Sequence, residues 1–169
     1  ILIRLGLFLS FGRNYATDFY FPFLESVDLD IDPWSSWLIN GGKKDALPYG
    51  LVLFSCLLVI VKIEFFIRQI LPFLPTGTLL IFFLIAIDLQ ISKKLSGNNR
   101  PNINLIYLFS PIVLYVNYVY VQTDAIVGAL LLFFAILLFS RQEKAAGILL
   151  GLAVGCKFGV LVILPFLII

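Results

Sequence analysis

Residues 125–140, Ala-Ile-Val-Gly-Ala-Leu-Leu-Leu-Phe-Phe-Ala-Ile-Leu-Leu-Phe-Ser, form a stretch of the chain that carries no charge. Apolar residues follow one another here without the alternation that a half-buried strand shows, so a helix is expected. The other apolar runs of the chain are 49–61, 69–87, 101–123 and 145–169, the last interrupted only by Lys157. A helix that crosses a bilayer needs about 20 apolar residues, and several of these runs reach or approach that length.

The composition also favours a chain surrounded by a bilayer. Of the 169 residues, 61% are apolar and 13% are charged, and an ordinary soluble domain has about twice that charged share. No water-soluble fold of this size has enough interior to bury so many apolar side chains. The sequence therefore argues against a soluble globular enzyme, a disordered chain and a disulfide scaffold, and it predicts that a bilayer surrounds much of the surface.

We expect an all-α fold in the form of a polytopic bundle of transmembrane helices. The polar, acidic and aromatic segment 12–48 is expected to be an extracytoplasmic first loop, and 49–169 to form about five helical membrane segments of the same module. The run 49–61 is short for a span and is expected to dip into the membrane and return. Because both ends of the chain lie inside apolar runs, we expect the N-terminal part of a longer multi-pass protein of the inner or plasma membrane, or of the endoplasmic reticulum.

Two short interfacial helices are expected within 12–48. Asp32 stands before a proline, and this pair is a good N-cap followed by proline at the first helical position. Trp34, Trp37 and Leu38 would then share one face of the helix, with the tryptophans at a membrane surface. The segment 15–26 has a similar half-apolar face.

The charges are unevenly distributed. Acids concentrate before residue 46, whereas basic residues gather in 93–100 and 141–144. The positive-inside rule predicts that these basic loops are cytoplasmic and that Asp18 and Gln122 lie on the opposite side. No basic stripe lies on a polar helix, so nucleic acid is not an expected partner. Cys56 and Cys156 lie in apolar runs and are expected to be unpaired thiols.

Asp18 is the first acid after the first apolar run. It either caps a helix or lies in a solvated loop, or it serves as a general base or metal ligand, and the residues alone give the two interpretations similar weight. The alternating acids of Val27-Asp-Leu-Asp-Ile-Asp32 fit a polar loop edge better than a site for a divalent cation.

Gln122 and Asp124 flank a tight turn between two apolar runs. They could cap the next helix, as Asp124 would do well, or they could face a polar cavity. Lys157 is a lone charge in an apolar run, so it must snorkel, pair with an acid or bind an anion such as a lipid phosphate, and we favour a functional role. Asp88 and Glu64 are interpreted as polar groups at helix ends.

Four motifs carry a family resemblance through their order. The first is Tyr15-Ala-Thr-Asp-Phe-Tyr20, in an acidic loop after a truncated first span, and the second is Gly41-Gly-Lys-Lys-Asp-Ala-Leu-Pro-Tyr-Gly50. The third is Ser110-Pro-Ile-Val-Leu-Tyr115 followed by Gln122-Thr-Asp124, similar to a span that ends in Gly-Gln-x-Asp, with Val121 in place of the glycine. The fourth is Gly147-Ile-Leu-Leu-Gly-Leu-Ala-Val-Gly-Cys-Lys-Phe158, followed by Leu164-Pro-Phe166. In this order the chain resembles the N-terminal half of the GT-C glycosyltransferases, closest to the GPI mannosyltransferase catalytic subunits and their bacterial relatives.

The resemblance implies transfer of a hexose such as mannose from a polyprenyl- or dolichyl-phosphate carrier to an acceptor hydroxyl outside the cytoplasm. Asp18 matches the family's loop acid, which acts as the base on that hydroxyl. The residues expected to bind the donor and its phosphate are Lys157, Gln122 and Asp124. Those expected at an acceptor or loop site are Tyr20, Asp45 and Tyr49.

The expected partners are the lipid-linked sugar donor and membrane lipids. No residue is assigned as a metal ligand, although a divalent cation, Mg²⁺ or Mn²⁺, is a candidate cofactor. Two other functions stay open. A transporter or flippase for a lipid-linked or anionic substrate would also explain Lys157 and the polar turn, and a non-catalytic membrane subunit would use the acidic loop as a docking surface.

Overall fold

The computed structural model describes residues 1–169 except 12–13, 28–31, 44–46, 48, 97–100 and 168–169. Every regular element in the described residues is helical, as expected, and none is a strand. The elements are α1 (Leu2–Phe11), η1 (Ala16–Tyr20), α2 (Phe21–Glu25), α3 (Pro33–Ile39), α4 (Leu51–Ile70), α5 (Thr78–Ser96), α6 (Pro101–Leu108), α7 (Pro111–Leu114), η2 (Tyr115–Val119), α8 (Asp124–Phe139), α9 (Glu143–Cys156) and η3 (Phe158–Leu167).

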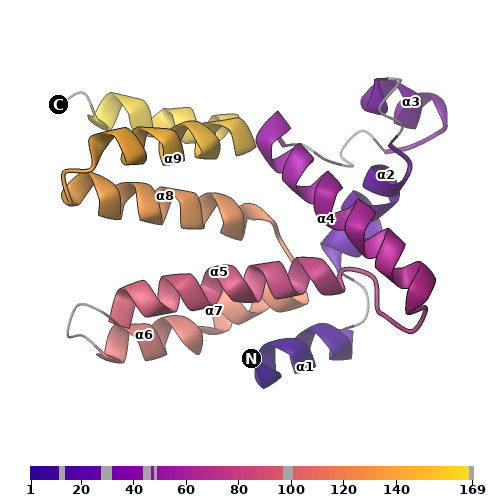
Figure 1. The fold of residues 1–169 in the computed structure, drawn as a ribbon, viewed down its shortest axis with the longest axis horizontal. Helices are drawn as coiled ribbons and strands as arrows, with labels where there is room; N and C mark the ends of the chain where they lie inside the picture. The colour runs from indigo at the N-terminus through magenta and orange to yellow at the C-terminus, as the bar shows by residue number, and fades with distance from the viewer. Residues whose placement is uncertain (12–13, 28–31, 44–46, 48, 97–100, 168–169) are drawn as a thin grey trace.

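Most of the helices lie in a stack (Figure 1). α8 and α9 are antiparallel neighbours, and α5 packs against α8 and also against α1 and α6. α4 crosses this stack at an angle and contacts α2, α5 and α9, with α3 beyond it. The crossing helix therefore joins the N-terminal elements to the C-terminal helix pair.

No helix in the described residues combines the length and the apolar character needed to cross a membrane. The two longest helices are interrupted by charge, with Lys62, Glu64 and Arg68 in α4 and Asp88, Lys93 and Lys94 in α5. α8 and α9 have 16 and 14 residues, fewer than the about 20 that a span requires. The prediction of a polytopic transmembrane bundle with a multi-pass membrane location is therefore wrong. The inside and outside assignment of the loops, which depended on those spans, is not supported.

Helix caps, a proline and an extended residue divide the long apolar runs into shorter helices, and a hydropathy profile does not detect them. Run 101–123 contains α6, α7 and η2, because the Ser110 hydroxyl accepts a hydrogen bond from the backbone N–H of Val113 (3.5 Å) and Pro111 occupies the first position of α7. In 145–169, α9 ends at Cys156, where Lys157 adopts an extended backbone. The run 49–61 does not dip and return, because it continues as α4 to Ile70.

The prediction of a helix after Asp32 is confirmed. The Asp32 carboxylate accepts hydrogen bonds from the backbone N–H groups of Trp34 and Ser35, both at 3.3 Å, at the start of α3. The rings of Trp34 and Trp37 lie 5.5 and 5.6 Å from the ring of Phe23, centroid to centroid. The tryptophan face therefore packs against α2, in contrast to the expected place at a membrane surface.

Glu64 joins the two longest helices. This buried acid lies in the second half of α4, and its carboxylate accepts hydrogen bonds from the backbone N–H groups of Gly77 (2.5 Å) and Leu79 (2.8 Å). Burial raises the pKa of Glu64, although the two N–H donors favour its ionised form. Glu64 thus caps the start of α5, a different helix from the one that contains it. Cys56 and Cys156 are free thiols, as expected.

Candidate functional site

Asp18 lies on the exposed side of a π-helical turn. Before η1, the side-chain oxygen of Asn14 accepts a hydrogen bond from the N–H of Thr17 (3.0 Å), and after it the Phe21 N–H donates to the Ala16 carbonyl. Ala16 and Tyr20 are buried by this turn, whereas Asp18 between them is exposed. The local sequence therefore holds the Asp18 carboxylate on the surface of a fixed turn.

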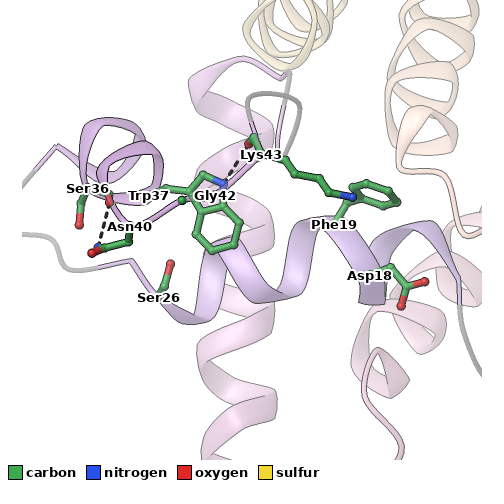
Figure 2. Close-up of a pocket in the computed structure, with 9 residues that line it drawn as sticks. Asp18, Phe19, Ser26, Ser36, Trp37, Asn40, Gly42 and Lys43 are labelled. Carbon is green, nitrogen blue, oxygen red and sulfur yellow. Dashed lines mark hydrogen bonds between the residues drawn. The ribbon is translucent and has the colours of Figure 1, made fainter.

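A pocket of about 380 Å³ lies between η1 and α3. It is lined by Asp18, Phe19, Ser26, Ser36, Trp37, Asn40, Gly41, Gly42 and Lys43. We call it the Trp37 pocket. Figure 2 shows Asp18 at one end of the pocket and Ser36 and Asn40 at the other. The pocket thus combines two aromatic rings, short hydrogen-bonding side chains, one carboxylate and one cation.

Contacts within the Trp37 pocket fix its aromatic wall. The indole Nε1 of Trp37 donates a hydrogen bond to the carbonyl of Lys43 (2.9 Å), and the Lys43 ammonium lies 4.8 Å from the centre of the Phe19 ring (Figure 2). A Cβ atom at Gly42 would lie 2.2 Å from the Trp37 ring. Only glycine at this position lets the backbone approach the indole so closely.

A second pocket, of about 320 Å³, shares Asp18 with the first. Its lining residues are Asn14, Tyr15, Asp18, Phe19, Tyr115, Val119 and Tyr120. We call it the Tyr120 pocket. Asp18 and Phe19 line both pockets, so one carboxylate borders two adjacent hollows.

Five of the predicted site residues come together in a cluster. The Lys157 ammonium lies 2.9 Å from both carboxylate oxygens of Asp124, and the Gln122 side-chain amide donates to the same carboxylate at 2.9 Å. The ammonium also lies 5.7 Å from the centre of the Tyr49 ring, and the Tyr49 hydroxyl is hydrogen-bonded to that of Tyr20 at 3.0 Å. We call this set, Tyr20, Tyr49, Gln122, Asp124 and Lys157, the Lys157 cluster.

The Lys157 cluster is partly open to solvent. The Lys157 and Asp124 side chains are 45% and 32% exposed. The hydrogen bond from Lys157 to Asp124 raises the pKa of that ammonium, so Lys157 stays charged at neutral pH. Tyr20 is buried, and this burial raises the pKa of its phenol.

Close backbone contact brings the two sides of the Lys157 cluster together. The N–H of Gly50 donates to the carbonyl of Cys156 (2.8 Å), which joins the start of α4 to the end of α9. A Cβ atom at Gly50 would lie 2.2 Å from the Gly155 carbonyl oxygen. Tyr49 and Lys157 flank this contact in sequence, so the glycine approach places their side chains beside each other.

The turn that carries Gln122 and Asp124 is strained. Val121 is fully buried and has a φ of 54°, a left-handed conformation that β-branched residues rarely adopt. The GT-C motif that this turn resembles has glycine at this position, and glycine is the residue best suited to that conformation. Thr123, the next buried residue of the turn, has a hydroxyl oxygen without a hydrogen-bond partner among the described residues.

Tyr15 connects the two parts of the site. Its ring stacks on Tyr120 at 5.1 Å and meets the Tyr20 ring edge-on at 5.2 Å, and its backbone N–H donates to the Tyr120 carbonyl at 3.1 Å. A continuous row of tyrosines thus leads from the Tyr120 pocket, which Asp18 borders, to the Lys157 cluster.

Asp124 does not cap α8 through its side chain, since it is the first residue of that helix and its carboxylate accepts from Lys157 and Gln122. Lys157 pairs with Asp124, and pairing with an acid was one of the three possibilities given for it from the sequence. Asp45 lies outside the described residues, as do Asp28 and Asp30.

Sequence reasoning missed a second polar cluster. Asp88 is 1% exposed and accepts hydrogen bonds from Arg4 (3.3 Å), Tyr107 (2.6 Å), Asn117 (3.3 Å) and Tyr118. We call these five residues the Asp88 cluster. One sequence signal could have indicated this cluster. Arg4 and Asp88 are each the one charged residue in an apolar stretch of the chain.

The described residues contain no group of three or more cysteine and acidic side chains placed to hold a metal ion. The expectation of Mg²⁺ or Mn²⁺ therefore stays a prediction without assigned ligands. The nearest cationic group to Asp18 within its own pocket is the ammonium of Lys43.

No family model matches the chain, and neither a curated protein nor a solved structure matches it. The resemblance to the GT-C glycosyltransferases therefore depends on the sequence motifs alone.

Proposed function

We propose that this protein transfers a sugar from a polyprenyl-phosphate donor to an acceptor hydroxyl, with Asp18 as the general base. The observation that carries the proposal is the position of Asp18 on the border of two adjacent pockets. A transfer reaction brings two substrates together, and the group that removes the acceptor proton must reach the point where they meet.

The chemistry requires one carboxylate. The Asp18 carboxylate accepts the proton of the acceptor hydroxyl while the hydroxyl oxygen forms a bond to the anomeric carbon of the donor sugar. The bond between that carbon and the phosphate oxygen breaks, and its electron pair leaves with the polyprenyl phosphate. Because the phosphate is already a good leaving group, the reaction needs no second residue as a strong acid.

The lining of the Trp37 pocket suits a sugar. Flat aromatic surfaces and short polar side chains are the combination that fits a ring with apolar faces and hydroxyl edges. Trp37 and Phe19 supply the surfaces, and Ser26, Ser36 and Asn40 line the pocket between them. We assign the acceptor sugar to this pocket and the donor to the Tyr120 pocket.

The donor phosphate would lie near a cation. Lys157 is the residue predicted for this role from the sequence, and the tyrosine row leads from the Tyr120 pocket toward it. Asp124 already neutralises Lys157, so phosphate binding there requires exchange of one anion for another. The partial exposure of this ion pair favours such an exchange, because solvent-exposed ion pairs are weak.

The test is turnover of a short-chain polyprenyl-phosphate mannose, measured as release of polyprenyl phosphate in the presence of a panel of sugar acceptors. Asp18→Asn keeps the shape of the side chain but cannot accept the proton, so turnover should fall about 10²–10⁴-fold. Glu143→Gln, an equivalent change at an exposed acid in the first turn of α9, should leave turnover unchanged.

Binding and turnover distinguish this proposal from its alternative. If Asp18→Asn binds donor and acceptor as the wild type does but turns over at the wild-type rate, Asp18 is not the base. If the wild type binds sugars and turns over none of the donor, the protein is a non-catalytic sugar-binding subunit and the proposal is wrong.

A further inference from the structure

A pocket of about 340 Å³ lies between the last turn of α5 and the second half of α8. Both helices end on the side of the stack away from α2 and α3 (Figure 1). The pocket is lined by Lys94, Leu95, Leu132, Ile136, Phe139 and Ser140. We call it the Lys94 pocket. It has no residue in common with the Trp37 or Tyr120 pockets.

The walls of the Lys94 pocket are apolar. Leu132, Ile136 and Phe139 follow one another at spacings of four and three, so they lie on one face of α8. Leu95 belongs to α5 on the other side. The Phe139 side chain is 88% exposed, which leaves a large aromatic surface in contact with solvent at the mouth. A surface of this kind gains free energy when an apolar group covers it.

The charge around this pocket is positive. Lys93 and Lys94 lie in the last turn of α5. Arg141 lies in the connection from α8 to α9 and Lys144 in the first turn of α9, at the same end of the molecule (Figure 1). Within the described part of the chain, none of these four cations forms an ion pair. Glu143 is the only acid in either segment. Among the described residues, Lys94 is the only charged one that lines the pocket.

We infer that the Lys94 pocket binds a single-chain anionic amphiphile, with its alkyl chain against Leu132, Ile136 and Phe139 and its phosphate or carboxylate head on Lys94. The apolar walls disfavour a bare inorganic anion, and the four unpaired cations favour an anionic head over a neutral one. The volume is at the small end of ligand pockets, which suits one chain and not a folded partner. This inference is independent of the proposed sugar transfer.

The probe is dodecyl phosphate, added below its micelle concentration and followed by titration calorimetry. Dodecanol and inorganic phosphate separate the contributions of chain and head. We expect dodecyl phosphate to bind in the Lys94 pocket both in the wild type and in Lys157→Gln, which removes the cation proposed for the sugar donor. We expect dodecanol and inorganic phosphate each to bind there at least about tenfold more weakly, because each lacks one of the two interactions.

Variants locate the site. Lys94→Gln should weaken dodecyl phosphate binding about fivefold or more, because it removes the cation that lines the pocket. The matched control is Lys144→Gln, which removes the same charge at the same end of the molecule but outside the lining, and it should change binding less than about twofold. Phe139→Ala should weaken binding about threefold or more, and the exposure of that ring predicts no loss of fold.

Three results would overturn the inference. Equal losses in Lys94→Gln and Lys144→Gln would show diffuse attraction to a basic surface, and equal affinity for dodecanol would show an apolar site without anion recognition. Wild-type affinity in Phe139→Ala and Lys94→Gln, with unchanged circular dichroism and thermal midpoint, would place the probe elsewhere.

Discussion

The Asp88 cluster and the Lys157 cluster use the same chemistry in opposite surroundings. Each has a carboxylate paired with a cation, a side-chain amide and two tyrosines. The Arg4 and Asp88 side chains are 9% and 2% exposed, whereas those of Lys157 and Asp124 are 45% and 32% exposed. Asp88 receives hydrogen bonds from four different side chains, and Asp124 receives them from two.

This difference separates structural from exchangeable polar groups. A buried carboxylate whose hydrogen-bonding capacity is filled holds its neighbours in one arrangement, and loss of a partner leaves an uncompensated charge. The Asp88 cluster joins α1, α5, α6 and η2 in this way. A half-exposed pair can exchange its partner for water or a ligand at little cost. The Lys157 cluster is therefore the better candidate for binding.

The largest expected effect comes from removing one charge in each cluster. Asp88→Asn leaves the Arg4 guanidinium buried without a counter-charge, so the free energy of unfolding should fall by about 3–5 kcal/mol. Asp124→Asn should lower it by less than about 1 kcal/mol, because water solvates the ammonium of Lys157. Urea denaturation of both variants under the same conditions measures the two values.

Equal losses would contradict the comparison. In particular, a cost below about 1 kcal/mol for Asp88→Asn would show that the hydrogen bonds of the remaining side chains, and not the charge, hold these four elements together.

A glycine exchange tests the contact that builds the Lys157 cluster. The new Cβ of Gly50→Ala would meet the Gly155 carbonyl, so α4 and α9 must separate, and the protein should lose about 1–3 kcal/mol of stability. Gly151→Ala provides the control in α9, because nothing lies within 4 Å of its new Cβ and helix propensity should add about 0.5–1 kcal/mol. Thermal unfolding of the two variants should therefore shift in opposite directions.

The smallest expected effect concerns the strained turn before Asp124. Val121→Ala loses buried surface but keeps the positive φ, whereas Val121→Gly loses more surface and relieves the strain. Because the left-handed conformation costs a non-glycine residue about 1–2 kcal/mol, the glycine variant should be about 1 kcal/mol more stable than the alanine variant. The reverse order in chemical denaturation would show that Val121 is not strained.

Local sequence signals correctly predicted part of the fold. Asp32 before a proline predicted the start of α3, and the unbroken apolar composition of 125–140 predicted the helix α8. These signals work because capping and helix formation depend on residues within about one turn of each other. Hydropathy failed where a cap or an extended residue divides an apolar run, as Ser110 and Lys157 do.

By itself the sequence determined that the chain is helical, where α3 begins, and which polar residues are isolated in apolar surroundings. Only the tertiary structure decided how those residues pair. Arg4 meets Asp88 across 84 positions and Lys157 meets Asp124 across 33. The composition likewise could not say whether helices or lipid cover the apolar side chains, because transfer from water is favourable in both cases. The packing of α1 against α5 and of α8 against α9 decided these pairings, since long-range contacts depend on where whole helices meet.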